Sequence, residues 1–334
     1  MVEGLPLGPG ASGEPVRDLQ ARLASVGHDS SDDTLGTYGS ATEEAVRRFQ
    51  AQRGLHVDGV CGQQTWSALV EAGYRLGDRL LYHRTPLLRG DDVHELQQRL
   101  GALGFDAGRV DGFFGVNSAK ALKDFQQNVG LTCDGICGPD TLAALHRLGG
   151  SVTGVAAGGT EATTEAEVRE RDRLRRARRG LAGQRVVVAE FGGLDALATA
   201  LTRSLQDEGA VVATLHHPDG SVLAADANAF DAEAYVGLSL RPGPDCTLSY
   251  YASPGFESVG GRRLAECARE EIAATFGADT AAVAGMRLPV LRETVMPAVQ
   301  LEIGLPRLAV EGAADLVAAL VRALVAWVDA PLEG

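Results

Sequence analysis

Two kinds of hydrophobic pattern divide the chain. In its first half, apolar residues recur at helical spacing in short segments that end at glycines, as Leu96 and Leu100 do before Gly104. Glycine suits the left-handed position that ends a helix. Asp91 and Asp92 precede this segment, and we expect their carboxylates to cap the free N–H groups at its start. The pattern therefore predicts short helices joined by glycine turns.

The first half also contains a repeat. Phe49-Gln50 recurs as Phe125-Gln126, 76 residues later, and the Asp-Gly turn that follows each pair recurs with it. Each copy predicts three short helices around one small core. The expected segments are an N-terminal extension (1–12), a first module (13–72), a connector (73–89) and a second module (90–148).

In the second half, short runs of β-branched residues alternate with amphipathic helical segments. Such alternation is typical of an α/β domain in which helices flank a mixed sheet. We expect this domain over residues 181–330. The expected strands are 185–190, 209–215, 234–240, 246–252 and 297–303, and the expected helices are 194–208, 258–276 and 312–328.

The two halves are joined by residues 149–180, which begin as a Gly/Ala/Thr linker and continue as an arginine-rich helix from Glu165. One interpretation is a solvated helix that opens the α/β domain. The other is a docking stripe for an acidic partner or an anionic cell-wall precursor. The residues of this stripe are Arg175, Arg176, Arg178 and Arg179.

Charge and composition narrow the function classes. The chain has 334 residues and a formal charge of −13, which repels phosphate backbones and argues against nucleic acid as the main partner. No apolar run approaches the roughly 20 residues of a membrane helix. The first residues lack a basic and an apolar secretory region, so we expect a cytoplasmic protein.

The chain has five cysteines, and Cys133 and Cys137 have no second Cys/His pair at zinc spacing beside them. We expect the cysteines to be small packing residues.

An Asp-Gly-x-x-Gly element occurs at Asp111-Gly112 and Asp134-Gly135 in the second copy and at Asp58-Gly59 in the first. Together with the Leu-Gln and Phe-Gln pairs, it resembles the peptidoglycan-binding type 1 domain. The resemblance implies a three-helix module that binds the glycan–peptide polymer, and it makes these six residues ligand-binding candidates. The alternative is that they only form turns, because Asp bonds back to backbone N–H groups and Gly adopts positive φ.

The α/β half resembles the zinc-dependent N-acetylmuramoyl-L-alanine amidases (amidase type 3). The block from Met296 to Gly304 carries the strongest similarity, and the resemblance puts the family's catalytic glutamate at Glu302. It also implies two zinc-binding histidines, near Phe191 and at Arg241. Neither side chain binds zinc, since phenylalanine has no lone pair to offer and arginine is cationic.

His216 and His217 are the histidines of this half, and we expect them to be exposed turn residues. Glu190 and Glu302 could face one another, but two carboxylates without histidine bind zinc poorly. We therefore expect no metal and no catalytic residue set, with Glu302 the one catalytic position retained.

Taken whole, the chain resembles actinobacterial amidase homologues that act inside the cell. The resemblance implies a non-catalytic regulator of cell-wall synthesis that binds peptidoglycan or its precursors. It further implies two partners, the MurA-type enolpyruvyl transferase and a wall-sensing kinase. The alternatives are an active zinc amidase that hydrolyses the muramic acid–L-alanine amide bond, and a wall-binding adaptor without a regulatory role.

Overall fold

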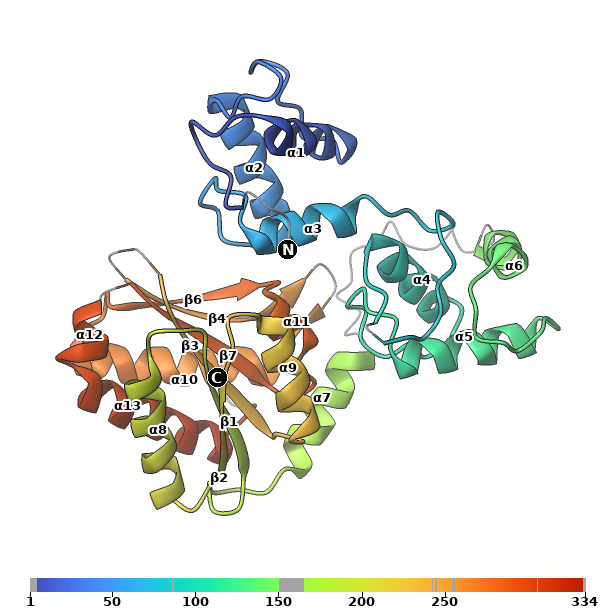
Figure 1. The fold of residues 1–334 in the computed structure, drawn as a ribbon. Coiled ribbons are helices and arrows are strands. Elements are labelled where there is room, and N and C mark those ends of the chain that lie inside the picture. Colours follow the sequence, from blue (N-terminus) through green and yellow to red (C-terminus); the bar gives the residue numbers. More distant parts are fainter. Residues whose placement is uncertain are drawn as a thin grey trace. The chain divides into compact units, whose positions relative to one another are not determined.

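The computed structural model describes residues 5–85, 87–149, 165–241, 243, 245–253, 256–304 and 306–332. The chain forms two compact units, Met1–Ala162 and Thr163–Gly334. The first unit is helical and contains both repeat copies, and the second is built on a sheet (Figure 1). The predicted fold class, two helical modules followed by an α/β domain with a mixed sheet, is confirmed.

Each module packs three helices around a small apolar core. Leu19, Phe49 and Trp66 meet in the first core, and Leu96 and Phe125 meet in the second. The helices of the first module are α1 (Glu14–Ser25), α2 (Ser40–Arg53) and α3 (Gln63–Ala72). Those of the second are α4 (Asp91–Ala102), α5 (Val116–Asn128) and α6 (Pro139–Gly149).

The start of α4 agrees only in part with the expectation of side-chain caps. Gly90 is the N-cap of α4 and offers no side-chain acceptor, while Asp91 and Asp92 are the first helical residues. Oδ1 of Asp92 accepts the free N–H of Val93 at 2.9 Å, as expected, and both carboxylates also pair with arginines, Asp91 with Arg53 and Asp92 with Arg79. They still oppose the positive end of the helix dipole.

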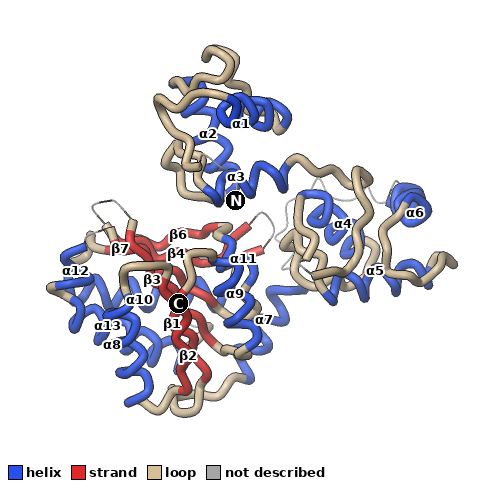
Figure 2. Tube along the Cα trace, viewed as in Figure 1, coloured by secondary structure: helices blue, strands red, loops and turns tan. Residues whose placement is uncertain are grey.

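The second unit contains a seven-stranded sheet in its described residues, in the order β2-β1-β3-β7-β4-β5, with β6 paired to β4 (Figure 2). Strands β1, β2, β3 and β7 are parallel, and β4 runs antiparallel to β7. The strands are β1 (Arg185–Glu190), β2 (Val211–His216), β3 (Ala234–Leu240), β4 (Cys246–Ser253), β5 (Phe256–Glu257), β6 (Ala281–Met286) and β7 (Ala298–Ile303).

Helices cover both faces of the sheet. One face packs against a core to which α8, α10 and α13 contribute, and the other packs against α9 and α11. The side chain of Leu174 attaches α7 to the sheet by packing into the first of these cores. The helices are α7 (Glu165–Arg176), α8 (Asp195–Asp207), α9 (Gly220–Ala229), α10 (Val259–Phe276), α11 (Pro289–Glu293), α12 (Pro306–Val310) and α13 (Ala313–Asp329).

The sequence pattern did not reveal α9, β5, β6, α11 or α12, which are short or weakly amphipathic. In the part of the chain that the structure describes, no helix combines the length and apolar character that crossing a bilayer requires.

Candidate functional site

The topology of the sheet directs attention to the carboxyl ends of β1 and β3. Strand β1 lies between β2 and β3. The β1–β2 crossover places α8 on one face, and the β2–β3 crossover places α9 on the other. Ligands of open α/β sheets bind where the crossovers diverge in this way. The residues that follow β1 and β3 are therefore the first candidates for a site.

Phe191 and Arg241 both lie at this edge of the sheet. The Phe191 ring packs against the α9-side core, and its N–H donates to the Leu238 carbonyl at 3.2 Å. Arg241 follows β3 directly, and its N–H donates to the Ile303 carbonyl at 3.1 Å. The edge that the amidase resemblance assigns to zinc-binding histidines thus carries an apolar ring and a guanidinium.

Glu302 is the buried carboxylate of β7. It is 7% exposed, and its register partner on β3 is Ser239. Its Oε2 lies 3.7 Å from Nη1 of Arg241. The residue at the implied second histidine position therefore supplies a fixed positive charge beside Glu302, where the amidase resemblance implies a metal.

A different set of donors converges at the ends of β1 and β2. Glu190 ends β1, His216 ends β2 beside it, and Asp195 begins α8. Nδ1 of His216 contacts Oε1 of Glu190 and lies 3.4 Å from Oδ1 of Asp195. His216 is thus a strand residue in contact with a buried carboxylate. It is exposed, as expected, but the expected location in a turn is wrong.

The sequence interpretation missed this cluster, although a signal was present. Side chains at the carboxyl ends of adjacent parallel strands lie at one edge of a sheet. Glu190 ends the predicted strand 185–190, and His216 directly follows the predicted strand 209–215.

Register separates this cluster from Glu302. Glu190 pairs with Leu238 on β3, whose side chain lies in the α8-side core. Glu302 pairs with the next residue, Ser239, and successive side chains of a strand point to opposite faces. Glu190 and Glu302 are therefore on opposite faces and two strands apart, roughly 10 Å at the usual strand spacing. The interpretation that they could face one another is not supported by this register.

The chemistry of these residues decides where zinc fits. Zinc sites use Cys, His and carboxylate donors. Phe191 and Arg241 supply none, so the positions implied by the amidase resemblance do not fit the metal.

Buried glutamines organise the Asp-Gly turns of the modules. Gln126 of α5 donates from Nε2 to Oδ1 of Asp134 at 2.8 Å, to the Ile136 carbonyl at 3.1 Å and to Oγ1 of Thr141 at 3.2 Å. Its Oε1 accepts the N–H of Gly135 at 2.9 Å. The bond from the Ile136 N–H, followed by that from Gln126, lowers the pKa of Asp134. This carboxylate is therefore engaged within its own turn.

The other Asp-Gly turns repeat this arrangement. Gln50 binds Asp58 and the Gly59 N–H, and Gln97 binds Asp111 and the Gly112 N–H. In the turn of the first module that lacks Asp, Gln20 still accepts the Gly36 N–H at 2.8 Å and donates to the Thr37 carbonyl. The glutamine is thus the common element. Ligand binding by the six Asp and Gly residues stays a prediction.

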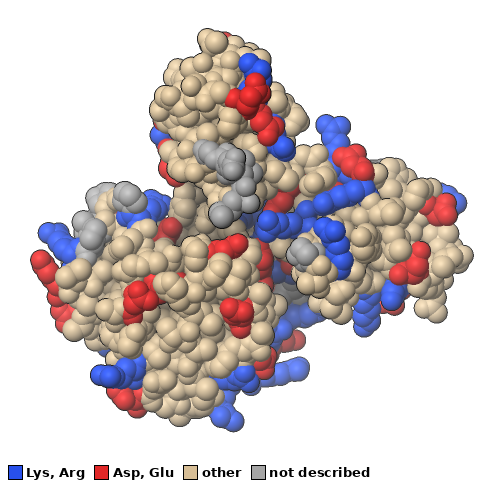
Figure 3. Space-filling view, viewed as in Figure 1, with Lys and Arg blue, Asp and Glu red and all other residues tan. Residues whose placement is uncertain are grey.

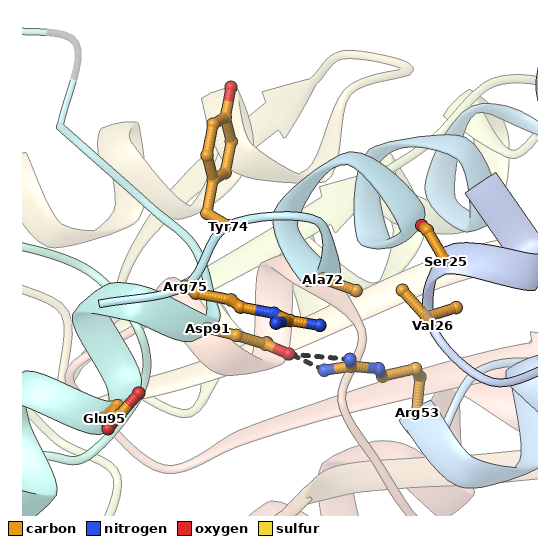
Figure 4. A pocket seen from close by; sticks show the side chains of 8 residues that line it. All are labelled: Ser25, Val26, Arg53, Ala72, Tyr74, Arg75, Asp91 and Glu95. Atoms are coloured by element: carbon orange, nitrogen blue, oxygen red, sulfur yellow. Dashed lines mark hydrogen bonds and ion pairs between the residues drawn. The ribbon is translucent and has the colours of Figure 1, made fainter. Parts of the chain in front are cut away.

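A polar cleft lies where the two modules meet, and Figure 4 shows the side chains that line it. Arg53 of α2 makes a two-pronged ion pair with Asp91 of α4, at 2.8 and 2.7 Å. Arg75 lies alongside this pair in the cleft of about 430 Å³. Within the part of the chain that the structure describes, no carboxylate lies within ion-pair distance (4.0 Å) of the Arg75 guanidinium. The remaining lining residues are Ser25, Val26, Ala72, Tyr74 and Glu95.

The arginine stripe begins in α7, and other residues of the same unit bind part of it. Arg179 Nη1 donates to the Val328 carbonyl at 3.3 Å, and Arg175 pairs with Asp172 at 3.4 Å. Arg176 and Arg178 are exposed. On the face drawn in Figure 3, acidic and basic side chains are interspersed. Docking through the four arginines stays a prediction.

Both halves of the chain are similar to known proteins. Residues 12–69 and 89–145 match the family described as putative peptidoglycan binding domain. The chain is 35% identical over 330 residues to N-acetylmuramoyl-L-alanine amidase CwlM of Mycobacterium tuberculosis, covering 86% of this chain and 79% of CwlM. It is 36% identical over 166 residues to N-acetylmuramoyl-L-alanine amidase CwlL of Bacillus licheniformis, covering 43% and 46%.

Among solved structures, N-acetylmuramoyl-L-alanine amidase AmiC2 of Nostoc punctiforme matches with a TM-score of 0.36 and 20% identity, over 44% of this chain and 98% of that one. The identity to CwlM extends across the modules and the α/β domain. The chain belongs to the peptidoglycan-binding N-acetylmuramoyl-L-alanine amidase family that includes CwlM.

Proposed function

We propose that this family member is a non-catalytic regulator of cell-wall synthesis that binds peptidoglycan or its precursors and acts in the cytoplasm. One observation carries the proposal: Arg241 pairs with Glu302 where the amidase resemblance requires a histidine-bound metal. A guanidinium is always charged and donates hydrogen bonds only, so it can neither bind zinc nor activate water.

Two further features support the loss of hydrolysis. Phe191 packs against the α9-side core, so an apolar side chain occupies the position near which the amidase resemblance implies a zinc-binding histidine. Glu302 lies on the opposite sheet face from the donor cluster around Glu190. A general base must be within hydrogen-bond reach of the water it activates, about 2.6–3.2 Å or one further water away. A separation of two strands does not meet this requirement.

The binding half of the proposal rests on the modules. Both copies match the peptidoglycan-binding family, and both keep the glutamine-organised turns. The cleft at the module junction adds the exposed Arg75, which offers a guanidinium to carboxylates of a stem peptide. We propose this cleft as the precursor-binding surface.

Turnover is the direct test of the catalytic half. Full-length protein, loaded with excess zinc, is incubated with muropeptides, and release of peptide is measured beside an active amidase. We expect no release above buffer. Release that disappears in Glu302→Gln would establish the alternative, an active zinc amidase, and refute the proposal.

Binding is measured separately, by titrating soluble muropeptide and nucleotide-linked precursor into the full chain. We expect saturable binding that weakens about tenfold or more in Arg75→Gln, since a hydrogen bond to a charged group contributes about 1.5–3 kcal/mol. Arg203→Gln, an exposed arginine of α8, is the charge-matched control. Equal weakening in both variants would exclude the cleft.

The regulatory half concerns the proposed partner, a MurA-type enolpyruvyl transferase, and control by a wall-sensing kinase. Transferase turnover is measured with and without the full chain. The docking variant carries Arg175→Gln and Arg176→Gln and leaves Arg179 in place because that residue bonds α13. Its control carries Arg203→Gln and Arg307→Gln. If the docking variant binds the transferase at low salt as tightly as the unsubstituted chain does, the arginine stripe is excluded as the docking site.

The cytoplasmic location is tested separately, by fractionation of cells.

A further inference from the structure

The cluster at the ends of β1 and β2 offers a set of metal donors. Glu190, Asp195 and His216 each present one ligand atom, and these atoms all lie within 4.8 Å of one another. Among the residues that the structure describes, no other three His, Cys, Asp or Glu side chains converge in this way. The set combines one imidazole nitrogen with two carboxylates, a mixture that borderline divalent ions accept.

Glu190 is an unusual member because it is 1% exposed. Its Oε2 accepts the N–H groups of Gly192 at 2.8 Å and Leu194 at 3.1 Å. These two bonds fix the carboxylate plane and leave Oε1 directed at His216 and the cluster. A buried carboxylate is costly without a compensating positive charge.

The conformation of the loop after β1 orients the Glu190 carboxylate. Gly192 and Gly193 have φ of 124° and 87°, values that side-chain-bearing residues rarely adopt. The loop turns back so that its N–H groups meet Oε2 of Glu190. Metal-binding carboxylates in proteins are typically held by hydrogen bonds of this kind. Here the bonds to Oε2 leave Oε1 for the ion.

We propose that Glu190, Asp195 and His216 bind one divalent metal ion of the zinc class at the α8 face of the sheet edge. Magnesium and calcium prefer all-oxygen donor sets, so the imidazole selects against them. The site is distinct from the histidine positions implied by the amidase resemblance, since its nitrogen donor comes from β2 and neither Phe191 nor Arg241 contributes a donor. Bound there, the ion ties the start of α8 to β1 and β2.

This inference goes beyond the proposed function and does not depend on it. Binding of metal without turnover leaves the regulator proposal intact. Turnover that requires Glu302 refutes the regulator proposal, whatever metal this cluster binds. The two proposals therefore fail in different experiments.

The test uses full-length protein freed of metal by a chelator. Zn²⁺ is titrated calorimetrically, and Co²⁺ is titrated by its visible absorption, with Mg²⁺ as the comparison ion. We expect one Zn²⁺ per chain, a higher melting temperature with Zn²⁺, and no saturation by Mg²⁺ at equal concentration.

Variants locate the ion. The side chains of His216 and Asp195 are 56% and 77% exposed, so His216→Ala and Asp195→Asn should fold, which melting of the metal-free variants verifies. We expect each to weaken Zn²⁺ binding about a hundredfold or more, because each removes a direct ligand. His217→Ala is the matched control, since its ring accepts from the Asp219 N–H outside the cluster.

Two results would overturn the proposal. One is the absence of stoichiometric Zn²⁺ binding by the unsubstituted chain. The other is Zn²⁺ affinity in His216→Ala that equals that of the His217→Ala control, which would show that the ion binds elsewhere.

Discussion

Replacing the buried Gln126 by leucine should release the Asp134 turn of the second module. The side chain of Gln126 is 1% exposed and has four polar partners: three acceptors share the two N–H groups of Nε2, and Oε1 accepts from the Gly135 N–H. Leucine has a similar volume but no polar atom. The substitution therefore removes the bonds without opening a large cavity.

The magnitude follows from what is left behind. Gly135 has a φ of 74°, and its buried N–H loses its acceptor in the variant. A buried donor without a partner costs about 1–3 kcal/mol, and each lost bond contributes about 0.5–1.5 kcal/mol. The apolar leucine offsets part of this loss. We expect the free energy of unfolding of the second module to fall by about 3 kcal/mol.

Hydrogen exchange measured by mass spectrometry resolves this module within the full chain. A loss of about 3 kcal/mol corresponds to about a hundredfold faster exchange in peptides that cover residues 131–145, at about 1.4 kcal/mol per tenfold. Gln127→Leu is the control, since its side chain is exposed one position along the same helix. Surface changes of this kind stay within about 0.5 kcal/mol.

The reasoning fails if exchange in the Gln126→Leu variant matches that in the Gln127→Leu control. Such a result would mean that the Asp-Gly turn holds its shape without the glutamine. Faster exchange confined to the first module would refute it as well, because the bonds lost belong to the second.

Three other predictions concern the first unit. A double-mutant cycle on Arg53→Ala and Asp91→Ala should give a coupling free energy of about 1 kcal/mol, since the pair is two-pronged but partly exposed; additive losses would show that the pair does not couple the modules. Cys133 is exposed and should react rapidly with a thiol reagent at pH 8, whereas the buried Cys61 and Cys137 should react only after unfolding, which mapping of labelled peptides checks. Burial raises the pKa of the Cys61 and Cys137 thiols to about 12, so below pH 9 each module keeps the full stabilisation that its neutral thiol contributes. This stabilisation should be lost as the pH rises toward 12, because the thiols ionise first in the unfolded chain. An unfolding free energy from urea titrations that stays constant between pH 9 and pH 12 would contradict this.

The sequence by itself determined the elements that local pattern encodes. Helical spacing around Leu96 and the repeat of Phe49-Gln50 located the modules, and the β-branched runs located most strands within two residues. Gly104 adopts the expected left-handed φ of 85°. These features depend on neighbours within a few residues, so periodicity and turn chemistry are enough to find them.

The role of the repeated glutamines was visible only in part. Gln50 and Gln126 stood out as repeat residues, but their burial and bonds to the Gly59 and Gly135 N–H groups come from packing. The Asp-Gly pairs became ligand-binding candidates through the resemblance to the peptidoglycan-binding domain. In the fold, the carboxylates of Asp58 and Asp134 are hydrogen-bonded within the turns.

Tertiary structure decided which side chains meet at the carboxyl ends of the strands. Strand order brings His216 of β2 to Glu190 of β1, and register turns Glu302 to the other face. The identities of Phe191 and Arg241 were enough to argue against a zinc site at their own positions. Which of the remaining donors meet depends on crossovers between distant segments and on a side-chain alternation that a shift of one residue reverses. Linear spacing does not encode that. The sequence placed Glu190 and His216 near the ends of two strands, and only the fold showed that they meet Asp195 in one donor cluster.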